Sequence, residues 1–276
     1  PNAPNEKLND CIAACDRINN SQLFDLSDDY KEKFMYNNGS HIKDFIYAVP
    51  YEASLKQGMC YARYRTWRYG GANGFYTTVL TPSCGGNFAM NPEFAELFCL
   101  PGDCRNDIIV GDPSKEKTLV YEYDPVTGEK TTTPHMYEGK QVEFTKHITL
   151  IREDGDLDVG ADGTRQGYRS INFFPDAIDY ILYVRNQDND IPIFRYADIL
   201  LTKCEAIVRG GEATLGDTPM SLFNQIRTYV SPNRDGSLDI DHAPSLQEIL
   251  DERGREFLDE HWRRNDLIRF GDYERA

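Results

Sequence analysis

Apolar positions follow helical spacing near both ends of the chain. Near the N-terminus they recur at three- and four-residue steps, at Leu8, Ile12, Cys15 and Ile18. This spacing predicts an amphipathic helix over about residues 5–19. A shorter helix is predicted after Ser27, with Tyr30 and Phe34 on one face. Residues 45–50 have the composition of a short buried strand or extended segment.

Three further helices are predicted in the C-terminal third. The first begins near Pro192 and ends at the two glycines at 210–211, a common C-terminal signal. The second carries Pro219 in its first turn. The third opens with Ser245 and Glu248, the two side chains of a capping box. Helices paired through short connections are typical of a TPR-like arrangement.

The middle of the chain has no helical stripe. From residue 51 to 111, Gly, Pro and Asn are interleaved with aromatic residues, and irregular stretches of this length are usually functional or disordered. Residues 117–151 nearly alternate apolar and polar positions around turn-forming residues at 124–128. This pattern predicts a small β-hairpin insert between two helical parts.

The charge balance excludes some classes of partner. The chain has 30 Lys and Arg against 45 Asp and Glu, a net charge of −15, which disfavours nucleic acid and direct docking to anionic lipid. The aromatic content of 12% indicates a folded protein. No stretch approaches the roughly 20 apolar residues of a membrane helix, and the first residues do not resemble a signal peptide. Any targeting signal is expected to have been removed or to lie outside this chain.

Seven cysteines are too few for a disulfide-dense scaffold. Three are predicted to pack in the core: Cys11, Cys15 and Cys204. Cys99 and Cys104 bracket a turn that could bring their sulfurs together, so a local disulfide and two free thiols are both open. Cys60 with Cys84 is a weaker candidate pair. No cysteines have the spacing of a structural zinc site.

Several segments between residues 167 and 269 resemble motifs of the SusD/RagB family. They are Ile193-Phe-Arg-Tyr-Ala-Asp-Ile-Leu-Leu201 with Cys204-Glu-Ala206, Phe223-Asn-Gln-Ile-Arg227, Leu250-Asp-Glu-Arg-Gly-Arg-Glu-Phe-Leu258, Arg263-Arg-Asn-Asp-Leu-Ile-Arg269 and Gly167-Tyr-Arg-Ser-Ile-Asn-Phe-Phe-Pro175. The last segment has Asn172 where the family pattern has Lys. Each motif alone is weakly specific, but their order is the family's, and residues 5–50 fit that order too. Residues 51–166 resemble nothing in detail.

The resemblance implies a mainly α-helical fold, a SusD-like TPR-type scaffold with long irregular loops and a small β-hairpin insert. The chain would form a single region over residues 1–276. Its scaffold would comprise residues 1–50 and 165–276, and the ligand loops and hairpin insert would comprise 51–164. The family has a longer N-terminal part and a tail beyond residue 276, so this chain is expected to correspond to roughly the C-terminal two-thirds of such a protein.

The resemblance also implies a non-enzymatic role in nutrient uptake. The expected protein is a lipoprotein on the extracellular face of the outer membrane of Bacteroidetes-type cells, with its lipid on a cysteine outside this chain. It would bind an oligosaccharide and deliver it to a SusC-like TonB-dependent transporter. Capture of peptide, as in RagB-like proteins, and a structural lid without a ligand site are the alternatives. Which glycan or peptide is bound does not follow from the sequence.

The motif helices carry many charged residues, which are Arg195, Asp198, Glu205, Arg227, Glu252, Arg253, Glu256, Asp266 and Arg269. Arginines and carboxylates on packed helices form bidentate ion pairs that hold the layers in register. We therefore expect these residues to stabilise the scaffold rather than to form an active site.

Residues 61–76 are the candidate ligand segment, because rings, arginines and an amide gather there among glycines. Aromatic faces suit the C–H face of a sugar ring, and Arg and Asn donors reach its hydroxyls. The predicted ligand-binding residues are Trp67, Tyr64, Tyr69, Tyr76, Arg68 and Asn73. Alternatively, the rings are buried and pin a long loop, or the two-residue period forms an ordinary strand with one wet face.

Metal and catalytic patterns are weaker. Asp154, Asp156 and Asp158 alternate in a glycine-rich loop that could hold calcium, but Val159 breaks the EF-hand pattern. We expect a solvated acidic loop rather than a calcium site. No cofactor is expected. The five histidines have no catalytic or metal-binding spacing, and no Gly-x-Ser-x-Gly motif is present. A glycosidase with two carboxylates far apart in sequence is the less favoured alternative.

Overall fold

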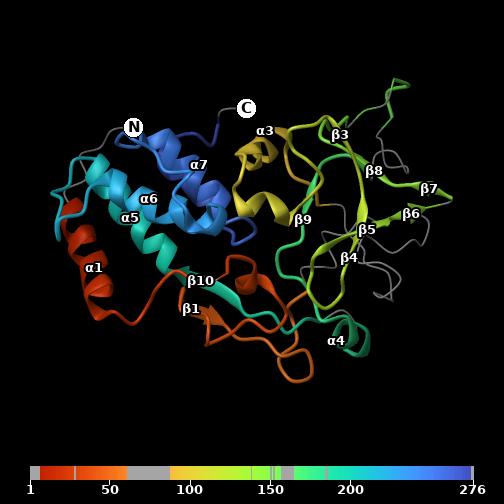
Figure 1. Ribbon diagram of the computed structural model, residues 1–276, viewed down its shortest axis with the longest axis horizontal. Helices are drawn as coiled ribbons and strands as arrows, with labels where there is room; N and C mark the ends of the chain where they lie inside the picture. The colour runs from red at the N-terminus through yellow and green to blue at the C-terminus, as the bar shows by residue number, and fades with distance from the viewer. Residues whose placement is uncertain are drawn as a thin grey trace.

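The computed structural model describes residues 7–27, 29–60, 88–137, 139–149, 151, 153–156, 165–183 and 186–274. Its longer helices are α1 (Leu8–Ser21), α5 (Tyr196–Val208), α6 (Pro219–Val230), α7 (Leu246–Glu256) and α8 (Arg263–Phe270). Shorter helices are α3 (Pro92–Ala95), α4 (Ala177–Leu182) and the 3-10 turns η1 (Lys31–Phe34), η3 (Glu96–Cys99), η4 (Cys104–Ile108) and η6 (Pro232–Arg234). Figure 1 shows α1, α5, α6 and α7 on one side of the molecule and the strands of the insert on the other.

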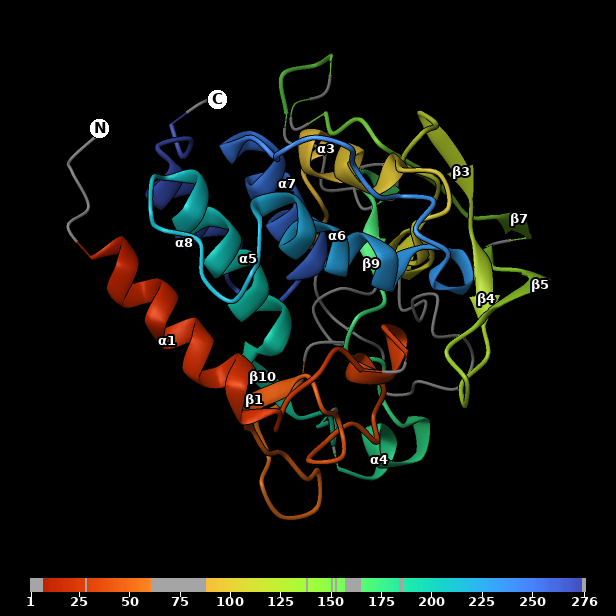
Figure 2. The ribbon, with the colours of Figure 1, turned by 60° about the vertical axis from the view of Figure 1, so that its left-hand side comes forward.

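Helix α5 lies at the centre of the helical layer and contacts α1, α6 and α7 (Figure 2). The apolar faces of α5, α6 and α7 share one core, made by residues that include Leu200, Leu201, Cys204, Phe223, Ile226 and Ile249. Capping boxes begin α6, at Thr218 and Ser221, and α7, at Ser245 and Glu248. Each box satisfies N–H groups that the first helical turn leaves without partners. The predicted helical scaffold is therefore confirmed.

The boundaries differ from the prediction where strands replace helix. Residues Ile191–Arg195 form strand β10, antiparallel to β1 (Phe45–Val49), and α5 begins only at Tyr196. The backbone of these residues pairs with β1 instead of starting the helix. Strand β1 is half-exposed rather than buried, because Tyr47 on its outer face is 58% exposed. The helix predicted after Ser27 is one 3-10 turn, η1.

The hairpin insert is confirmed and is larger than one hairpin. Three antiparallel pairs form it: β3 (Lys117–Leu119) with β8 (Glu143–Thr145), β4 (Tyr121–Tyr123) with β5 (Lys130–Pro134), and β6 (Met136–Tyr137) with β7 (Lys140–Gln141). The turn between β4 and β5 depends on Asp124, whose carboxylate accepts hydrogen bonds from the backbone N–H groups of Val126 and Thr127. Two hairpins therefore project from the β3–β8 pair (Figure 1).

A second hydrophobic core joins the insert to the rest of the chain. Strand β2 (Ile109–Val110) pairs with β9 (Arg169–Ser170), and the core beneath them includes Phe98, Val120, Phe144, Tyr168 and Phe173. Gly167 precedes β9 with a φ of +75°. A Cβ atom there would lie 2.5 Å from the Cβ of Ala89, so this position requires glycine for space as well as for conformation.

A buried cluster of charges links the N-terminal segment to the C-terminal helices. Its five carboxylates are Asp44, Asp103, Glu252, Glu256 and Glu260, and its five cations are Lys33, Arg105, Arg195, Arg227 and Arg255. Glu256 is central, because its carboxylate oxygens lie 2.8 Å from Arg195, 3.1 Å from Arg105 and 3.5 Å from Lys33. With all ten groups ionised the charges balance, which favours burying so many of them; burial nevertheless raises the pKa of Glu260 to about 7, against the opposing effect of Arg195.

The remaining motif charges also form ion pairs inside the scaffold. Arg253 binds Asp198 at 2.7 Å and Asp266 at 2.8 Å. Arg269 binds Asp266 at 2.7 Å and also pairs with Glu205. These contacts agree with the structural role expected for the motif residues.

Of the two alternatives left open for Cys99 and Cys104, the structure shows the free thiols. Cys99 and Cys104 are both free thiols, as is Cys60, while Cys84 lies outside the described residues. The turn between Cys99 and Cys104 is shaped by Asp103, whose carboxylate caps η4 and binds Arg105. The expected core positions of Cys15 and Cys204 are confirmed, and burial raises the pKa of Cys15 to about 12. Cys11 is only partly buried.

Acid is expected to destabilise the protein through this charge cluster. Burial by itself would raise the pKa of Asp44, but Lys33 and Arg195 outweigh it and hold that pKa at about 2. A carboxyl whose pKa is lower in the folded state contributes stability above its unfolded pKa of about 4 and loses it as the pH falls to about 2. We expect a loss on the order of 2 kcal/mol from Asp44 over that interval, measured by urea denaturation at successive pH values.

The variant Asp44→Asn should be less stable at neutral pH and should lose less further stability between pH 4 and pH 2. Asp10→Asn, at an exposed position on α1, is the control and should follow the wild type. A wild-type free energy of unfolding that stays level down to pH 2 would contradict this assignment.

Candidate functional site

The predicted ligand residues are not placed by the structure. Trp67, Tyr64, Tyr69, Tyr76, Arg68 and Asn73 all belong to residues 61–87, outside the described ranges. Their role stays a prediction.

The acidic loop is described only in part. Asp154 and Asp156 are exposed, and the backbone N–H of Asp156 donates to the Asp154 carboxylate at 3.1 Å. Asp158 lies outside the described residues. Within the described parts of the chain, no group of three or more His, Cys, Asp or Glu residues could hold a metal ion. A calcium site that includes Asp158 remains a prediction.

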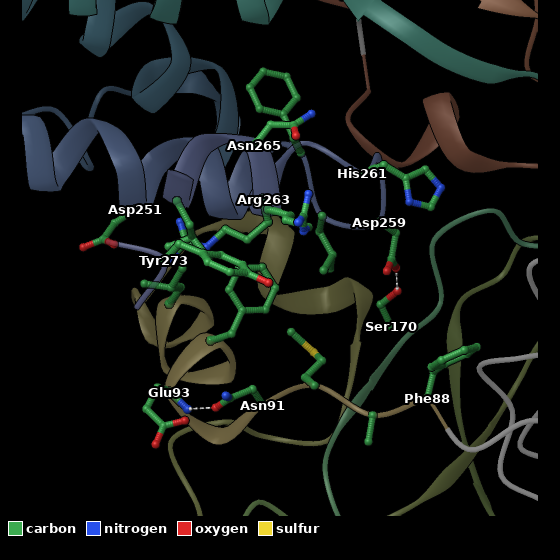
Figure 3. Close-up of a pocket in the computed structure, with 18 of the residues that line it drawn as sticks. Phe88, Asn91, Glu93, Ser170, Asp251, Asp259, His261, Arg263, Asn265 and Tyr273 are labelled. Atoms are coloured by element: carbon green, nitrogen blue, oxygen red, sulfur yellow. Dashed lines mark hydrogen bonds between the residues drawn. The ribbon is translucent and has the colours of Figure 1, made fainter. Parts of the chain in front are cut away.

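The described chain contains a large cleft between α3 and the C-terminal end of α7 with α8 (Figure 3). Its volume is about 1120 Å³. One side comes from residues 88–97 and another from residues 257–267, and Asp272 and Tyr273 also line it. Met90, Phe257 and Leu258 give the interior an apolar surface. Segments far apart in sequence thus build one concave surface.

The connection between α7 and α8 has an unusual backbone where it borders the cleft. Asp259 and His261 have φ values of +68° and +67°, although neither is glycine. Glu260 between them points the other way, where Arg195 Nε and Nη2 each donate to its carboxylate at 2.8 Å. The buried ion pair holds this left-handed turn, and both flanking residues line the cleft. The hydroxyl of Ser170 donates to the Asp259 carboxylate (Figure 3).

Two arginine–aromatic pairs form the wall on the α8 side. The guanidinium of Arg263 lies 5.2 Å from the ring centre of Phe94, and its Nη1 donates to the carbonyl of Leu250 at 2.8 Å. Partial burial lowers the pKa of Arg263, and the nearby Asp251 carboxylate opposes that shift. Arg264 lies 5.3 Å from the ring centre of Tyr273. Cation–π contacts of this kind hold flat side chains in defined orientations.

Gly254 on α7 makes room for this wall. A Cβ atom at position 254 would lie 2.8 Å from Leu97 Cδ1 and 2.9 Å from Arg263 Nη1. A larger residue there would require the end of the Leu97 side chain and the guanidinium of Arg263 to shift.

The charges that line the cleft nearly cancel. Its carboxylates are Glu93, Asp251, Asp259 and Asp272, and its cations are Arg169, Arg263 and Arg264. Arg169 is buried at the base, where burial lowers its pKa to about 9, so it carries charge at neutral pH. A surface with alternating donors, acceptors and rings suits an uncharged ligand with many hydroxyl groups better than a polyanion.

The sequence did not indicate this cleft. Residues 263–269 match a scaffold motif, and Asp266 and Arg269 do serve the scaffold. The signal that was available is a pair of arginines, Arg263 and Arg264, that comes before these structural residues and contacts aromatic rings. The sequence does not identify those rings, because Phe94 is far away along the chain and Tyr273 lies beyond the end of the helix.

No helix among the described residues is long and apolar enough to cross a bilayer.

Comparisons with known proteins place the fold. A stretch of 85 residues is 44% identical to the starch-binding protein SusD of Bacteroides thetaiotaomicron and covers 30% of this chain and 13% of that protein. Surface glycan-binding protein A of the same organism, solved with laminarihexaose, has a TM-score of 0.57 at 19% identity, covering 96% of this chain and 50% of that one. NanU of B. fragilis has a TM-score of 0.55 at 21% identity, covering 95% of this chain and 50% of that one.

The chain therefore spans about half the length of the solved structures that it resembles. The family model of the SusD family matches residues 16–276, nearly the whole chain. The chain belongs to the SusD family.

Proposed function

We propose that the intact protein binds glycan at the cell surface and delivers it to a SusC-like TonB-dependent outer-membrane transporter. The observation that carries this proposal is the SusD family match over residues 16–276. The ligand class is supported by two relatives, one named for starch binding and one solved with laminarihexaose. Anchoring would come from a lipid on a cysteine outside this chain.

The geometry supports binding of an extended, uncharged ligand. The cleft is open and combines rings with hydrogen-bonding groups. Phe88, which lines it, follows the predicted ligand segment 61–76 in the sequence, after the intervening residues 77–87.

Binding without catalysis is part of the proposal. The named relatives are binding proteins, and the motif carboxylates that could have formed a catalytic pair are bound to arginines in the scaffold. A glycosidase would need a carboxylic acid free to protonate the leaving oxygen and a second carboxylate across the sugar.

The partner can be tested directly. Tagged full-length protein, extracted from its native outer membrane, is expected to copurify with a TonB-dependent transporter and to bind an oligosaccharide in the same preparation. Protein that binds glycan but elutes alone would contradict delivery to a transporter. A stable complex that binds neither glycan nor peptide would support the structural-lid alternative instead, and peptide binding alone would support the RagB-like one.

A further inference from the structure

We propose that the cleft between α3 and α7–α8 is itself a binding site for a neutral, hydroxyl-rich ligand, a segment of an oligosaccharide chain. The described residues that line it are not among those predicted at 64–76. The ligand class rests on the proposed function, whereas the location rests on the cleft alone. The volume of about 1120 Å³ exceeds the usual range of about 300–1,000 Å³ for small-molecule pockets, so it admits more than one sugar unit.

The first argument is the turn that carries Asp259 and His261. Left-handed backbone is unfavourable at residues other than glycine, and two such residues are separated here by only one position. The buried pair of Arg195 and Glu260 supports this turn from inside the protein. The outcome is that Asp259 and His261 line the cleft together. Asp259, whose carboxylate also accepts from the Ser170 hydroxyl, contributes an acceptor to this surface, and His261 contributes an imidazole.

The second argument is the placement of aromatic rings. Phe88 is 68% exposed and Tyr273 is 51% exposed, and Figure 3 shows them at opposite ends of the cleft. Arg263 lies between them and uses one of its five N–H donors on the Leu250 carbonyl. Rings at both ends with hydrogen-bonding groups between them match the apolar faces and hydroxyl edges of successive sugars.

The third argument is charge. Four carboxylates and three guanidinium groups line the cleft, on a chain with a net charge of −15. The net negative charge repels anionic ligands, and the near balance of charges in the lining gives a cationic ligand little local gain. The proposed ligand is therefore a neutral glycan rather than a uronate or a sialylated glycan.

The test begins with full-length protein and a panel of neutral and acidic oligosaccharides that includes maltoheptaose and laminarihexaose. The affinity for the best neutral ligand is then measured by calorimetry for the double variant Phe88→Ala/Tyr273→Ala. We expect the affinity to fall by about tenfold or more, because each stacked ring raises the affinity by roughly three- to tenfold. The control is Tyr47→Ala, whose ring on β1 is similarly exposed, at 58%. The control should keep wild-type affinity, and both proteins should melt as the wild type does.

A second readout is independent of variants. The His261 ring lines the cleft, whereas His242 lies on the surface with its ring hydrogen-bonded to Glu248 at 2.9 Å. In NMR spectra of histidine-labelled protein, the neutral oligosaccharide should shift the His261 ring signals and leave those of His242 in place.

Each outcome decides between the two proposals. Tight neutral-glycan binding with an unmoved His261 and no effect of the double variant overturns the cleft site and leaves the proposed function standing. Failure of the wild type to bind any glycan overturns both. Binding confined to acidic glycans overturns the neutral ligand class.

Discussion

The variant Glu256→Ala is expected to lose about 3–5 kcal/mol of unfolding free energy, the largest effect of any single substitution predicted here. The Glu256 side chain is fully buried and its oxygens face Arg195, Arg105 and Lys33. Its removal leaves Arg195, Arg105 and Lys33 buried with too few carboxylates to balance their charges. Urea denaturation followed by circular dichroism measures the loss.

The matched control is Glu96→Ala. Glu96 pairs with Lys146 at 3.4 Å, but its side chain is 62% exposed. Exposed pairs contribute about 0–1 kcal/mol, so this variant should stay close to wild type. Equal, small losses for the two variants would show that the buried cluster does not hold the scaffold together.

The second large effect is expected for Trp67→Ala, which should abolish or sharply reduce glycan binding by the full-length protein with little change in melting temperature. Of the two tryptophans, Trp262 has a structural role, since its ring packs against Phe194 and contacts Arg253. Trp67 has no scaffold motif around it and lies among arginines and glycines. A stacked ring contributes about 0.5–1.5 kcal/mol beyond its buried area.

Calorimetry and thermal melting of the same sample distinguish the two roles of Trp67. A variant that loses several degrees of stability and keeps its affinity shows that the ring is part of the core. In that case the other predicted ligand residues of the segment, such as Tyr64 and Asn73, lose their support as well. Tyr47→Ala again serves as the exposed-ring control, with affinity and melting temperature unchanged.

Local signals in the sequence predicted the elements that depend on local chemistry. Ser245 and Glu248 form the capping box expected of them, and Pro219 occupies the first turn of α6. The start of α5 was misplaced because the partner of residues 191–195 is strand β1, far away in sequence. Long-range strand pairing has no signal within the segment itself.

The candidate site was beyond sequence reasoning for the same reason. The cleft needs Phe94 beside Arg263, and Tyr273 beside Arg264, contacts that only the packed fold creates. The sequence also does not indicate the left-handed backbone at Asp259 and His261, because neither position holds a glycine or an asparagine. The ion-pair character of the motif residues could be anticipated from their composition, whereas the choice of partners, such as Glu260 for Arg195, could not.

The central claim is that this SusD family chain belongs to a protein that binds glycan without cleaving it. The most direct measurement is calorimetric titration of the full-length protein with oligosaccharides, followed by product analysis of the same sample by mass spectrometry. The account predicts saturable binding of a neutral oligosaccharide that is recovered intact. Turnover of the glycan at ordinary enzyme rates, or the absence of binding to any glycan in the panel, would contradict it.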